Sequence, residues 1–341
     1  MKKQKLEHAG KSISERVWYR IFICFSTLLF VPCAALYCGL AVISYGPSPA
    51  ARDLFVVSML ETSALKFLPR IFWGPDAIRA IVEANAVAPP EGVSDTELIQ
   101  VTPPEDMEEE IIIEDVKGYT FRGKMMIVAD PSRLMVGISH NSFSKELRGL
   151  TVSEIISRHG GVGGVNAGGF ADENGKGDGS VPLGIVISEG ALKWGKKSAV
   201  YDIIGFDKEN RLIVGKMTGK QALDMGVRDA VSFGPVLILN GTPMEVKGFG
   251  GGLNPRTAIG QRADGAVLLL VIDGRQPNSL GGAMSDVIDL MAQYGAVNAA
   301  NLDGGSSTVM YRDGELINVC CSLYGPRDIP TALVVRNKAD E

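Results

Sequence analysis

Two apolar stretches end in Asp-Gly, and in both cases groups that can bind an anion follow. Asp273 comes after VLLLVI and precedes Gly274 and Arg275. Asp303 comes after AVNAANL and precedes the run Gly304, Gly305, Ser306, Ser307, Thr308. Successive glycine amides with hydroxyl groups can form a concavity that binds phosphate or sulfate. The pattern therefore predicts a site in which carboxylates lie beside a bound anion.

An Asp-Gly pair is also common in tight turns, and this alternative applies to each pair in the chain. A turn is the favoured interpretation of Asp264-Gly265 and Asp313-Gly314. Asp273 and Asp303 differ because each follows a strand typical of a protein core, where a loop should lead on to the next element. We therefore interpret these two aspartates as functional.

Three arginines stand in predicted loops, each beside a proline or glycine: Arg256 in NPRTAIG, Arg275 in DGRQPNS and Arg327 in YGPRDIPTAL. A guanidinium group can bind two phosphate oxygens at once. One such arginine would be an ordinary surface residue, so the prediction depends on all three converging. Thr257, next to Arg256, belongs to the same predicted set of substrate-binding residues.

The elements that must position these residues are a strand ending at Asp273, a helix over residues 286–294, and a strand ending at Asp303. Such a unit is almost always parallel with a right-handed crossover. Its two aspartates would then share the edge of the sheet where ligands of open α/β sheets bind. If the strand in GVGGVNAGGF is parallel to them, further substrate-binding candidates reach this edge: Asn166, Gly168 and Gly169.

The rest of residues 111–341 consists of short β-rich segments separated by glycine, and several resemble hairpins, such as TAIGQRADGAVLLLV. Two helices interrupt them, one from Val152 to about His159 with a capping box, and one after Ser285. The predicted fold class is α+β: a mixed sheet with β-hairpins and at least one parallel β-α-β unit, few helices, preceded by one N-terminal transmembrane helix.

The transmembrane helix is predicted over residues 21–45, which carry no charged side chain. At roughly 1.5 Å per residue this stretch exceeds the roughly 30 Å hydrocarbon core of a bilayer. Basic residues outnumber acidic ones ahead of it, so the positive-inside rule predicts a single-pass protein of the cell membrane with a cytoplasmic N-terminus. A cleaved signal peptide is the alternative, because small residues follow at 48–51.

Composition divides the chain into five predicted segments. They are a cytoplasmic basic tail at 1–20, the transmembrane helix at 21–45, a juxtamembrane helical segment at 46–86, a linker rich in proline and acidic residues at 87–110, and an extracellular domain at 111–341.

Charge and metal-binding residues narrow the functional classes. The chain has 34 Lys and Arg against 39 Asp and Glu, with no long basic run in its C-terminal two thirds, so nucleic acid is not indicated as a partner. Its 3 histidines are too few for a His-rich zinc or dinuclear hydrolase. Only Cys320 and Cys321 lie outside the membrane segment, which favours a bacterial surface over a disulfide-rich lumen. No cofactor is predicted with certainty, and a divalent cation at the aspartates is left open.

Six motifs carry a family resemblance: VNAGGF (165–170), PLGIVISEG (182–190), FGPVLILNG (233–241), PRTAIGQRADGAVLLLVIDGR (255–275), NLDGGSSTVMY (301–311) and RDIPTALVV (327–335). In this order, and over about residues 120 to 337, the chain resembles the phosphodiester glycosidase family, that of N-acetylglucosamine-1-phosphodiester α-N-acetylglucosaminidase. The resemblance implies hydrolysis of the glycosyl-phosphate bond of a sugar 1-phosphodiester. An N-terminal anchor favours phosphodiester-linked glycans of a cell surface or exopolysaccharide as substrates.

A phosphate monoester is a good leaving group, so such a site needs anion binding more than a general acid. It also needs a carboxylate that activates water or attacks the anomeric carbon. We interpret Asp303 as this carboxylate and Asp273 as its partner, although their roles could be exchanged. Arg256 and Arg327 would hold the phosphodiester, with Asn166 and Ser306 on the sugar or the phosphate. The alternative is a noncatalytic glycan-binding or phosphate-binding module of exopolysaccharide or cell-wall assembly.

Overall fold

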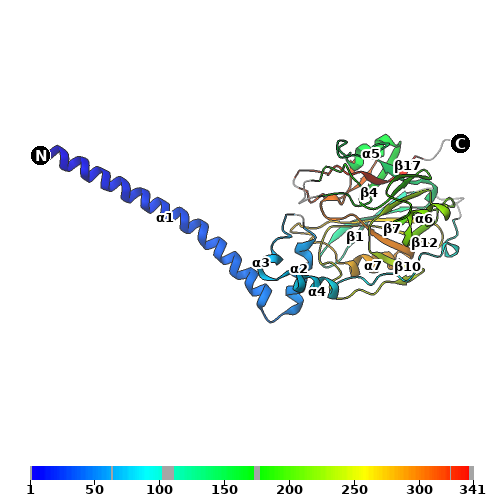
Figure 1. Cartoon of the computed structure of the whole chain (residues 1–341), viewed down its shortest axis with the longest axis horizontal. Helices are drawn as coiled ribbons and strands as arrows, with labels where there is room; N and C mark the ends of the chain where they lie inside the picture. The colour runs from blue at the N-terminus through cyan, green and yellow to red at the C-terminus, as the bar shows by residue number, and fades with distance from the viewer. Residues whose placement is uncertain (1, 63, 102–110, 173–176, 323, 338–341) are drawn as a thin grey trace. The chain divides into compact units, whose positions relative to one another are not determined.

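The structure is a computed structural model that describes residues 2–62, 64–101, 111–172, 177–322 and 324–337. It divides into two compact units, Met1–Phe55 and Val56–Glu341 (Figure 1).

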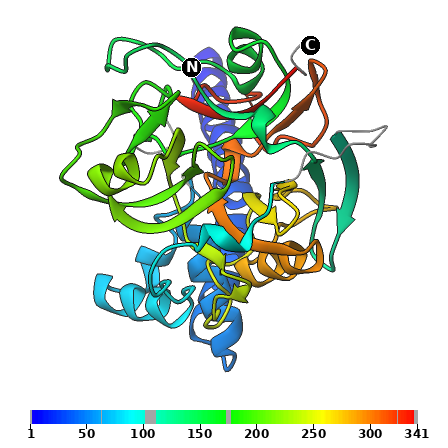
Figure 2. The ribbon, with the colours of Figure 1, turned by 90° about the vertical axis from the view of Figure 1, so that its right-hand side faces the viewer.

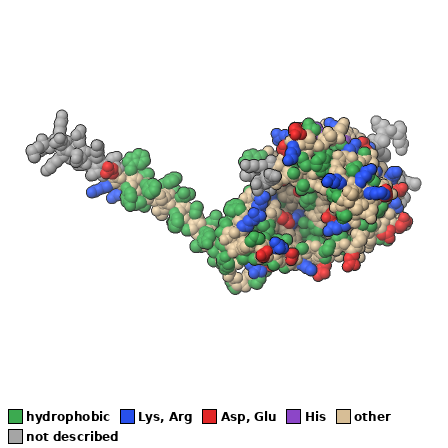
Figure 3. All heavy atoms as spheres, in the orientation of Figure 1, with side chains coloured by type: hydrophobic (Ala, Val, Ile, Leu, Met, Phe, Trp, Pro, Cys, Tyr) green, Lys and Arg blue, Asp and Glu red, His purple; other side chains and the backbone are tan. Residues whose placement is uncertain are grey.

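The first unit consists of α1 (Lys2–Tyr45) and the beginning of α2 (Pro49–Leu60). Within α1, Glu15–Tyr45 reaches a mean hydropathy of 2.2 and is long and apolar enough to cross a membrane. Its hydrophobic side chains are exposed along the helix (Figure 3). A signal sequence near the N-terminus can meet the same criterion of length and hydropathy, so both of the alternatives drawn from the sequence stand.

Besides the end of α2, the described part of the second unit has five short α-helices: α3 (Pro69–Phe72), α4 (Pro75–Ala84), α5 (Val152–Arg158), α6 (Gly219–Asp224) and α7 (Met284–Gln293). The capping box predicted for α5 is confirmed, since the Glu154 amide donates to Thr151 Oγ1 (3.3 Å) and the Thr151 amide to Glu154 Oε2 (2.8 Å). The helix expected after Ser285 begins slightly earlier, at Met284. The helix α6, which is only six residues long, is not predicted by the sequence pattern.

Three sheets form the body of this unit, and every strand pairing among the described residues is antiparallel. The largest has seven strands in the order β1 (Ile111–Lys117), β2 (Arg122–Val128), β13 (Val267–Ile272), β12 (Arg256–Arg262), β14 (Ala296–Leu302), β10 (Val236–Leu239), β11 (Thr242–Pro243). A five-stranded sheet runs β16 (Glu315–Leu316), β15 (Met310–Arg312), β4 (Gly161–Asn166), β17 (Thr331–Arg336), β3 (Leu134–Ile138). The other runs β6 (Ala191–Trp194), β5 (Val186–Ser188), β9 (Asp229–Ser232), β7 (Val200–Phe206), β8 (Leu212–Thr218). The predicted α+β class with β-hairpins and few helices is confirmed.

The predicted parallel β-α-β unit is not formed by neighbouring strands among the described residues. α7 does connect β13 to β14, but β12 lies between these strands and pairs with both in antiparallel fashion. The apolar run of β13 is typical of a strand covered on both faces. Here Leu268, Leu270 and Ile272 pack in a cluster with α7, while the alternate residues Val267, Leu269 and Val271 pack in a second cluster shared with the other sheets. Figure 2 shows α7 in orange covering one face of the large sheet.

The insertion of β12 preserves the shared edge that matters for the site. Arg256 pairs with Ile272 and Thr257 with Leu302, so the start of β12 lies beside the ends of β13 and β14. Since β13 and β14 are both antiparallel to β12, they run in the same direction and end at the same edge. Asp273 and Asp303 therefore lie at the same edge of the sheet, as the sequence predicts, although the strands that precede them are separated by β12.

Residues 56–62 and 64–101 pack within the second unit. Val87 and Val93 form isolated bridges with Val246 and Gly215, and the Gln100 amide donates to the Ala263 carbonyl (2.8 Å). Ile99 is buried. Composition predicts a linker at 87–110, whereas apolar residues within its proline-rich sequence attach 87–101 to the sheets. Residues 102–110 lie outside the described residues.

Candidate active site

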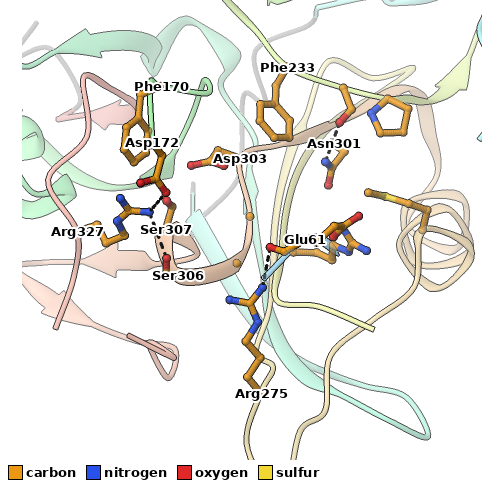
Figure 4. Close-up of a pocket in the computed structure, with 16 residues that line it drawn as sticks. Glu61, Phe170, Asp172, Phe233, Arg275, Asn301, Asp303, Ser306, Ser307 and Arg327 are labelled. Carbon is orange, nitrogen blue, oxygen red and sulfur yellow. Dashed lines mark hydrogen bonds and ion pairs between the residues drawn. The ribbon is translucent and has the colours of Figure 1, made fainter. Parts of the chain in front are cut away.

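A cavity of about 340 Å³ opens at the edge where β12 starts and β13 and β14 end. Its wall includes the predicted residues Asp303, Gly304, Gly305, Ser306, Ser307, Arg256, Arg275 and Arg327. Figure 3 shows a hollow in the globular unit with acidic and basic side chains around it. Figure 4 shows Asp303 between Phe170, Asp172 and Arg327 on one side and Phe233 and Asn301 on the other. The size is that of a small-molecule site.

Asp303 is the carboxylate in the middle of this cavity. Its side chain is partly accessible. Loss of bulk water raises the pKa of Asp303 to about 6, although a hydrogen bond from Ser307, the charge of Arg327 and the Gly304 amide lower it. A carboxyl group with this pKa can hold and release a proton near neutral pH, which suits a general base or a nucleophile.

Asn166 and Thr257 hold the backbone at Asp303 rather than line the cavity. Both side chains are fully buried. Asn166 Nδ2 donates to the Asp303 carbonyl, and Asn166 Oδ1 accepts from Thr257 Oγ1 (2.9 Å) and from the Val309 amide (3.2 Å). These bonds connect β4, β12 and the loop after β14, so the two residues fix where the Asp303 side chain begins.

Arg327 lies at one end of the cavity in a fixed orientation. Its Nη1 donates to Asp172 Oδ2 (2.7 Å) and to Ser306 Oγ (3.4 Å), and its guanidinium carbon lies 4.8 Å from the centre of the Phe170 ring. Desolvation raises the pKa of Asp172, but hydrogen bonds from Arg327 and the Gly177 amide lower it overall. Asp172 therefore stays ionised and balances the charge of Arg327.

Arg256 lies at the other end and is almost fully engaged within the protein. Its Nη1 donates to Glu61 Oε2 (2.7 Å), and its other nitrogens donate to the carbonyls of Gly251, Gly252 and Gly282. Burial raises the pKa of Glu61, and the charge and hydrogen bond of Arg256 oppose this rise. The sequence gives no signal for Glu61, which is nearly 200 residues away along the chain from its partner.

Arg275 is the exposed arginine of the three, and among the described residues it forms no ion pair with a carboxylate. Its Nη2 donates to the Glu61 carbonyl (3.2 Å) and to Asn254 Oδ1 (3.0 Å). Its φ of 59° is in the left-handed region, which is unfavourable for an arginine and is tolerated where the surroundings enforce it.

The glycines play a more structural part than the sequence predicts. The Gly304 amide bonds to Asp303 itself, and the Gly305 amide donates to the Pro255 carbonyl (2.9 Å). The Gly168 amide donates to Thr331 Oγ1 (3.2 Å), and a Cβ at Gly169 would lie 3.1 Å from the Phe233 ring. The amides of Gly168, Gly304 and Gly305 therefore have partners within the protein, and Gly169 allows close packing beside the cavity.

Asp273 lies at the predicted edge but outside the wall of the cavity. Its Oδ1 accepts from Asn318 Nδ2 (3.0 Å) and from the Val319 amide (3.0 Å). Burial raises the pKa of Asp273, and these two hydrogen bonds lower it in part. The structure thus brings Asp303 together with the three arginines, and it does not bring Asp273 to them.

Potential metal ligands and thiols are the remaining reactive groups of this region. No group of three or more His, Cys, Asp or Glu side chains is placed to hold a metal ion within the described part of the chain. Cys320 and Cys321 are free thiols whose sulfur atoms lie against the carbonyls of Ser306 (3.9 Å) and Gly305 (3.5 Å).

The family model of phosphodiester glycosidases matches residues 159–336, just over half of the chain. This chain belongs to the phosphodiester glycosidase family. The match includes β12, β13, β14 and the loop with Asp303, but it leaves Glu61 outside.

Individual relatives of the chain are distant. The SPbeta prophage-derived uncharacterized protein YomE of Bacillus subtilis (strain 168) is 27% identical over 235 residues, which are 64% of this chain and 33% of that protein. The chain thus spans about a third of the length of this curated relative. The catalytic domain of zebrafish N-acetylglucosamine-1-phosphodiester α-N-acetylglucosaminidase, auto-inhibited by its pro-peptide, has a similar fold, with a TM-score of 0.56, 22% identity, 70% of this chain and 87% of that chain. A putative exported protein from Burkholderia pseudomallei K96243 aligns with a TM-score of 0.46 and 18% identity over 64% of this chain and 74% of that one.

Several residues of the cavity wall were not predicted from the sequence. Phe233 and Asp172 stand inside or just after quoted family motifs, so their position could have suggested them. Asn301 begins the motif that contains Asp303. Glu61 and Met284 have no comparable signal, because only tertiary packing brings them to the cavity.

Proposed function

We propose that the protein is a hydrolase that cleaves the bond between the anomeric carbon and the phosphate oxygen of a sugar 1-phosphodiester. The observation that carries the proposal is Asp303, a carboxyl group with a pKa of about 6 in a cavity that also contains three arginines. Family membership supports the same reaction class. The relative from zebrafish is described by its name as acting on an N-acetylglucosamine 1-phosphodiester.

In this proposal Arg275 and Arg327 bind the phosphodiester. Arg256 and Arg327 form ion pairs with Glu61 and Asp172, whereas Arg275 forms no ion pair with a described carboxylate, although its charge also acts on Glu61. A phosphodiester carries one negative charge, which Arg275 can match. Arg327 Nη1 already contacts Ser306 Oγ, so an anion between these arginines would also meet a hydroxyl donor.

Asp303 then acts on the anomeric carbon. In its ionised form it either takes a proton from an attacking water molecule or attacks the carbon itself. Negative charge develops on the departing phosphate, and the fixed guanidinium groups stabilise this charge. Asp273 contributes indirectly in our proposal, through the loop that contains Asn318.

We propose further that α1 anchors the protein in a membrane with its N-terminus in the cytoplasm and the Val56–Glu341 unit outside. The apolar stretch Glu15–Tyr45 and the basic residues that precede it support this orientation. Phosphodiester-linked glycans of the cell surface or of an exopolysaccharide would then be accessible substrates.

The test is the release of reducing sugar from the methyl phosphodiester of glucose 1-phosphate or of N-acetylglucosamine 1-phosphate, using the full chain in detergent. We expect turnover by the wild type and a loss in kcat of roughly 10²–10⁴-fold in Asp303→Asn. Asp313→Asn is the matched control, because Asp313 stands in a turn with a φ of 50° that asparagine tolerates.

Stability separates a catalytic effect from misfolding. Because the pKa of Asp303 is raised to about 6, above that of a carboxyl group in the unfolded chain, its ionised form destabilises the folded state at pH 7. Asp303→Asn should therefore unfold at a temperature no lower than the wild type does. Unchanged sugar release in Asp303→Asn would contradict the assignment of this residue. Saturable binding of several diesters without any release would favour the noncatalytic binding module.

A further inference from the structure

One end of the cavity presents a negative charge to the ligand. Arg256 and Glu61 form an ion pair there, but the side chain of Arg256 is 4% exposed and that of Glu61 is 35% exposed. The guanidinium group is directed into the protein and donates to the carbonyls of Gly251, Gly252 and Gly282. An incoming ligand at this end therefore meets the carboxylate and not the arginine.

Glu61 is held in this position by a cradle of glycines. Gly250, Gly251 and Gly252 all have φ between 48° and 82°, in the left-handed region. A Cβ at Gly251 would lie 2.5 Å from Glu61 Oε1, and one at Gly252 would lie 2.3 Å from Ser58 Oγ. Ser58 Oγ also accepts a hydrogen bond from the Leu253 amide (3.0 Å). The end of α2 is thus fitted closely against this loop as part of the cavity wall.

Beyond Glu61 the same end has features of a carbohydrate site, while Arg275 contacts the Glu61 backbone on the side toward the phosphate. Its wall includes the apolar side chains of Phe233, Pro235 and Met284. Asn301 is 3% exposed, and its Oδ1 accepts no hydrogen bond in the described structure although its Nδ2 donates to the Gly234 carbonyl (2.9 Å). An unsatisfied buried acceptor is unfavourable, so a ligand donor that reached this oxygen would be stabilised. In Figure 4, Glu61 and Asn301 lie on the opposite side of Asp303 from Arg327.

We propose that Glu61 is a specificity-determining residue that accepts hydrogen bonds from hydroxyl groups of a neutral sugar and disfavours sugars that carry a carboxylate. This inference rests on the proposed function, since it places the phosphate at Arg275 and Arg327 and the sugar between Asp303 and Glu61. Carboxylate acceptors form strong hydrogen bonds with hydroxyl donors, and two negative charges in the same cavity repel one another. The specificity of the pocket thus depends on a residue outside the part of the chain that the family model matches.

Binding measurements on the full chain in detergent test this inference without requiring turnover. The probes are inorganic phosphate, glucose 1-phosphate and glucuronic acid 1-phosphate, which differ first by the sugar and then by one carboxylate. We expect the wild type to bind glucose 1-phosphate at least tenfold more tightly than glucuronic acid 1-phosphate. Glu61→Gln keeps an oxygen for Arg256 and should reduce this preference to less than threefold, with the affinity for inorganic phosphate unchanged.

Glu83→Gln, on the exposed face of α4, is the matched control and should behave as the wild type. Equal affinity of the wild type for the two sugar phosphates would overturn the inference. So would an equal change for all three probes in Glu61→Gln, because Glu61 would then act only on the anion site through Arg256. Increased turnover of every diester by Glu61→Gln would show that the α2 end obstructs the cavity, which also overturns it. If the sugar preference depends on Glu61 but no diester is cleaved, the proposed hydrolysis fails and the role of Glu61 stands.

Discussion

At the scale of single residues, the chemistry depends on how Asp303 is surrounded. The carboxyl group loses water, which raises its pKa, and it gains Ser307, Arg327 and the Gly304 amide as compensating partners. The balance leaves a group that is ionised at neutral pH yet basic enough to accept a proton. At Asp172 the hydrogen bonds from Arg327 and the Gly177 amide outweigh desolvation and lower the pKa, so this carboxylate remains a poor base. Two carboxylates in one cavity thus acquire different roles from their neighbours.

This balance predicts the pH dependence of the reaction. A general base or nucleophile must be ionised, so kcat/KM should fall about tenfold per pH unit below about 6 and stay level from 7 to 8. A pH profile of kcat/KM for a sugar 1-phosphodiester measures it. Because burial also raises the pKa of Glu61, Glu61→Gln is the control and should keep the acidic limb. A rate that instead falls above pH 6 would identify Asp303 as a general acid.

At the scale of elements, Asp273 connects the end of β13 to the loop after β16. Its carboxylate accepts from Asn318 Nδ2 and the Val319 amide, and Asn318 Oδ1 in turn accepts from the Met310 amide (2.8 Å). The following cysteines lie against the carbonyls of Gly305 and Ser306. Asp273 therefore fixes the segment from Asn318 to Cys321, which packs against the loop that contains Asp303.

Asp273→Ala should act mainly on stability. It removes the acceptor of the part-buried Val319 amide and one of the two acceptors of Asn318 Nδ2, which keeps its bond to the Thr308 carbonyl (3.3 Å). The lost hydrogen bonds to a charged group cost about 1–3 kcal/mol in total, so the melting temperature should fall by several degrees. We expect kcat at a temperature well below unfolding to remain within about tenfold of the wild type. A loss of kcat as large as that of Asp303→Asn, with an unchanged melting temperature, would instead support the catalytic partnership predicted from the sequence.

The sequence predicts most of the elements and the edge at which the site lies. The hairpin of β12 and β13, the helix α5 and the neighbourhood of Asp303 all follow from local patterns. The topology does not, because an apolar strand such as β13 has the same composition whether its neighbours are parallel or antiparallel. The partners of Arg256 could not be predicted either, since Glu61 comes from a distant segment and no spacing rule relates the two.

At the scale of the whole molecule, the N-terminal segment has two separable parts. Glu15–Tyr45 has the composition of a membrane span, while residues 56–101 belong to the globular unit. Glu61 in the second part lines the cavity. Val87 and Val93 form isolated bridges with Val246 and Gly215. Ser94 Oγ also accepts from the Val214 amide (3.0 Å) in β8.

Truncation should separate these parts. A chain of residues 46–341 should be soluble without detergent and retain wild-type kcat/KM, because it keeps the whole Val56–Glu341 unit. A chain of residues 111–341, the boundary that composition predicts, loses the buried Ile81 and Ile99 along with Glu61. Burial of such a side chain is worth roughly 1.5–3 kcal/mol, so its melting temperature should fall by about 10 °C or more. Calorimetry and diester turnover on both chains measure this difference, and equal stability and activity would show that residues 46–110 contribute nothing to the site.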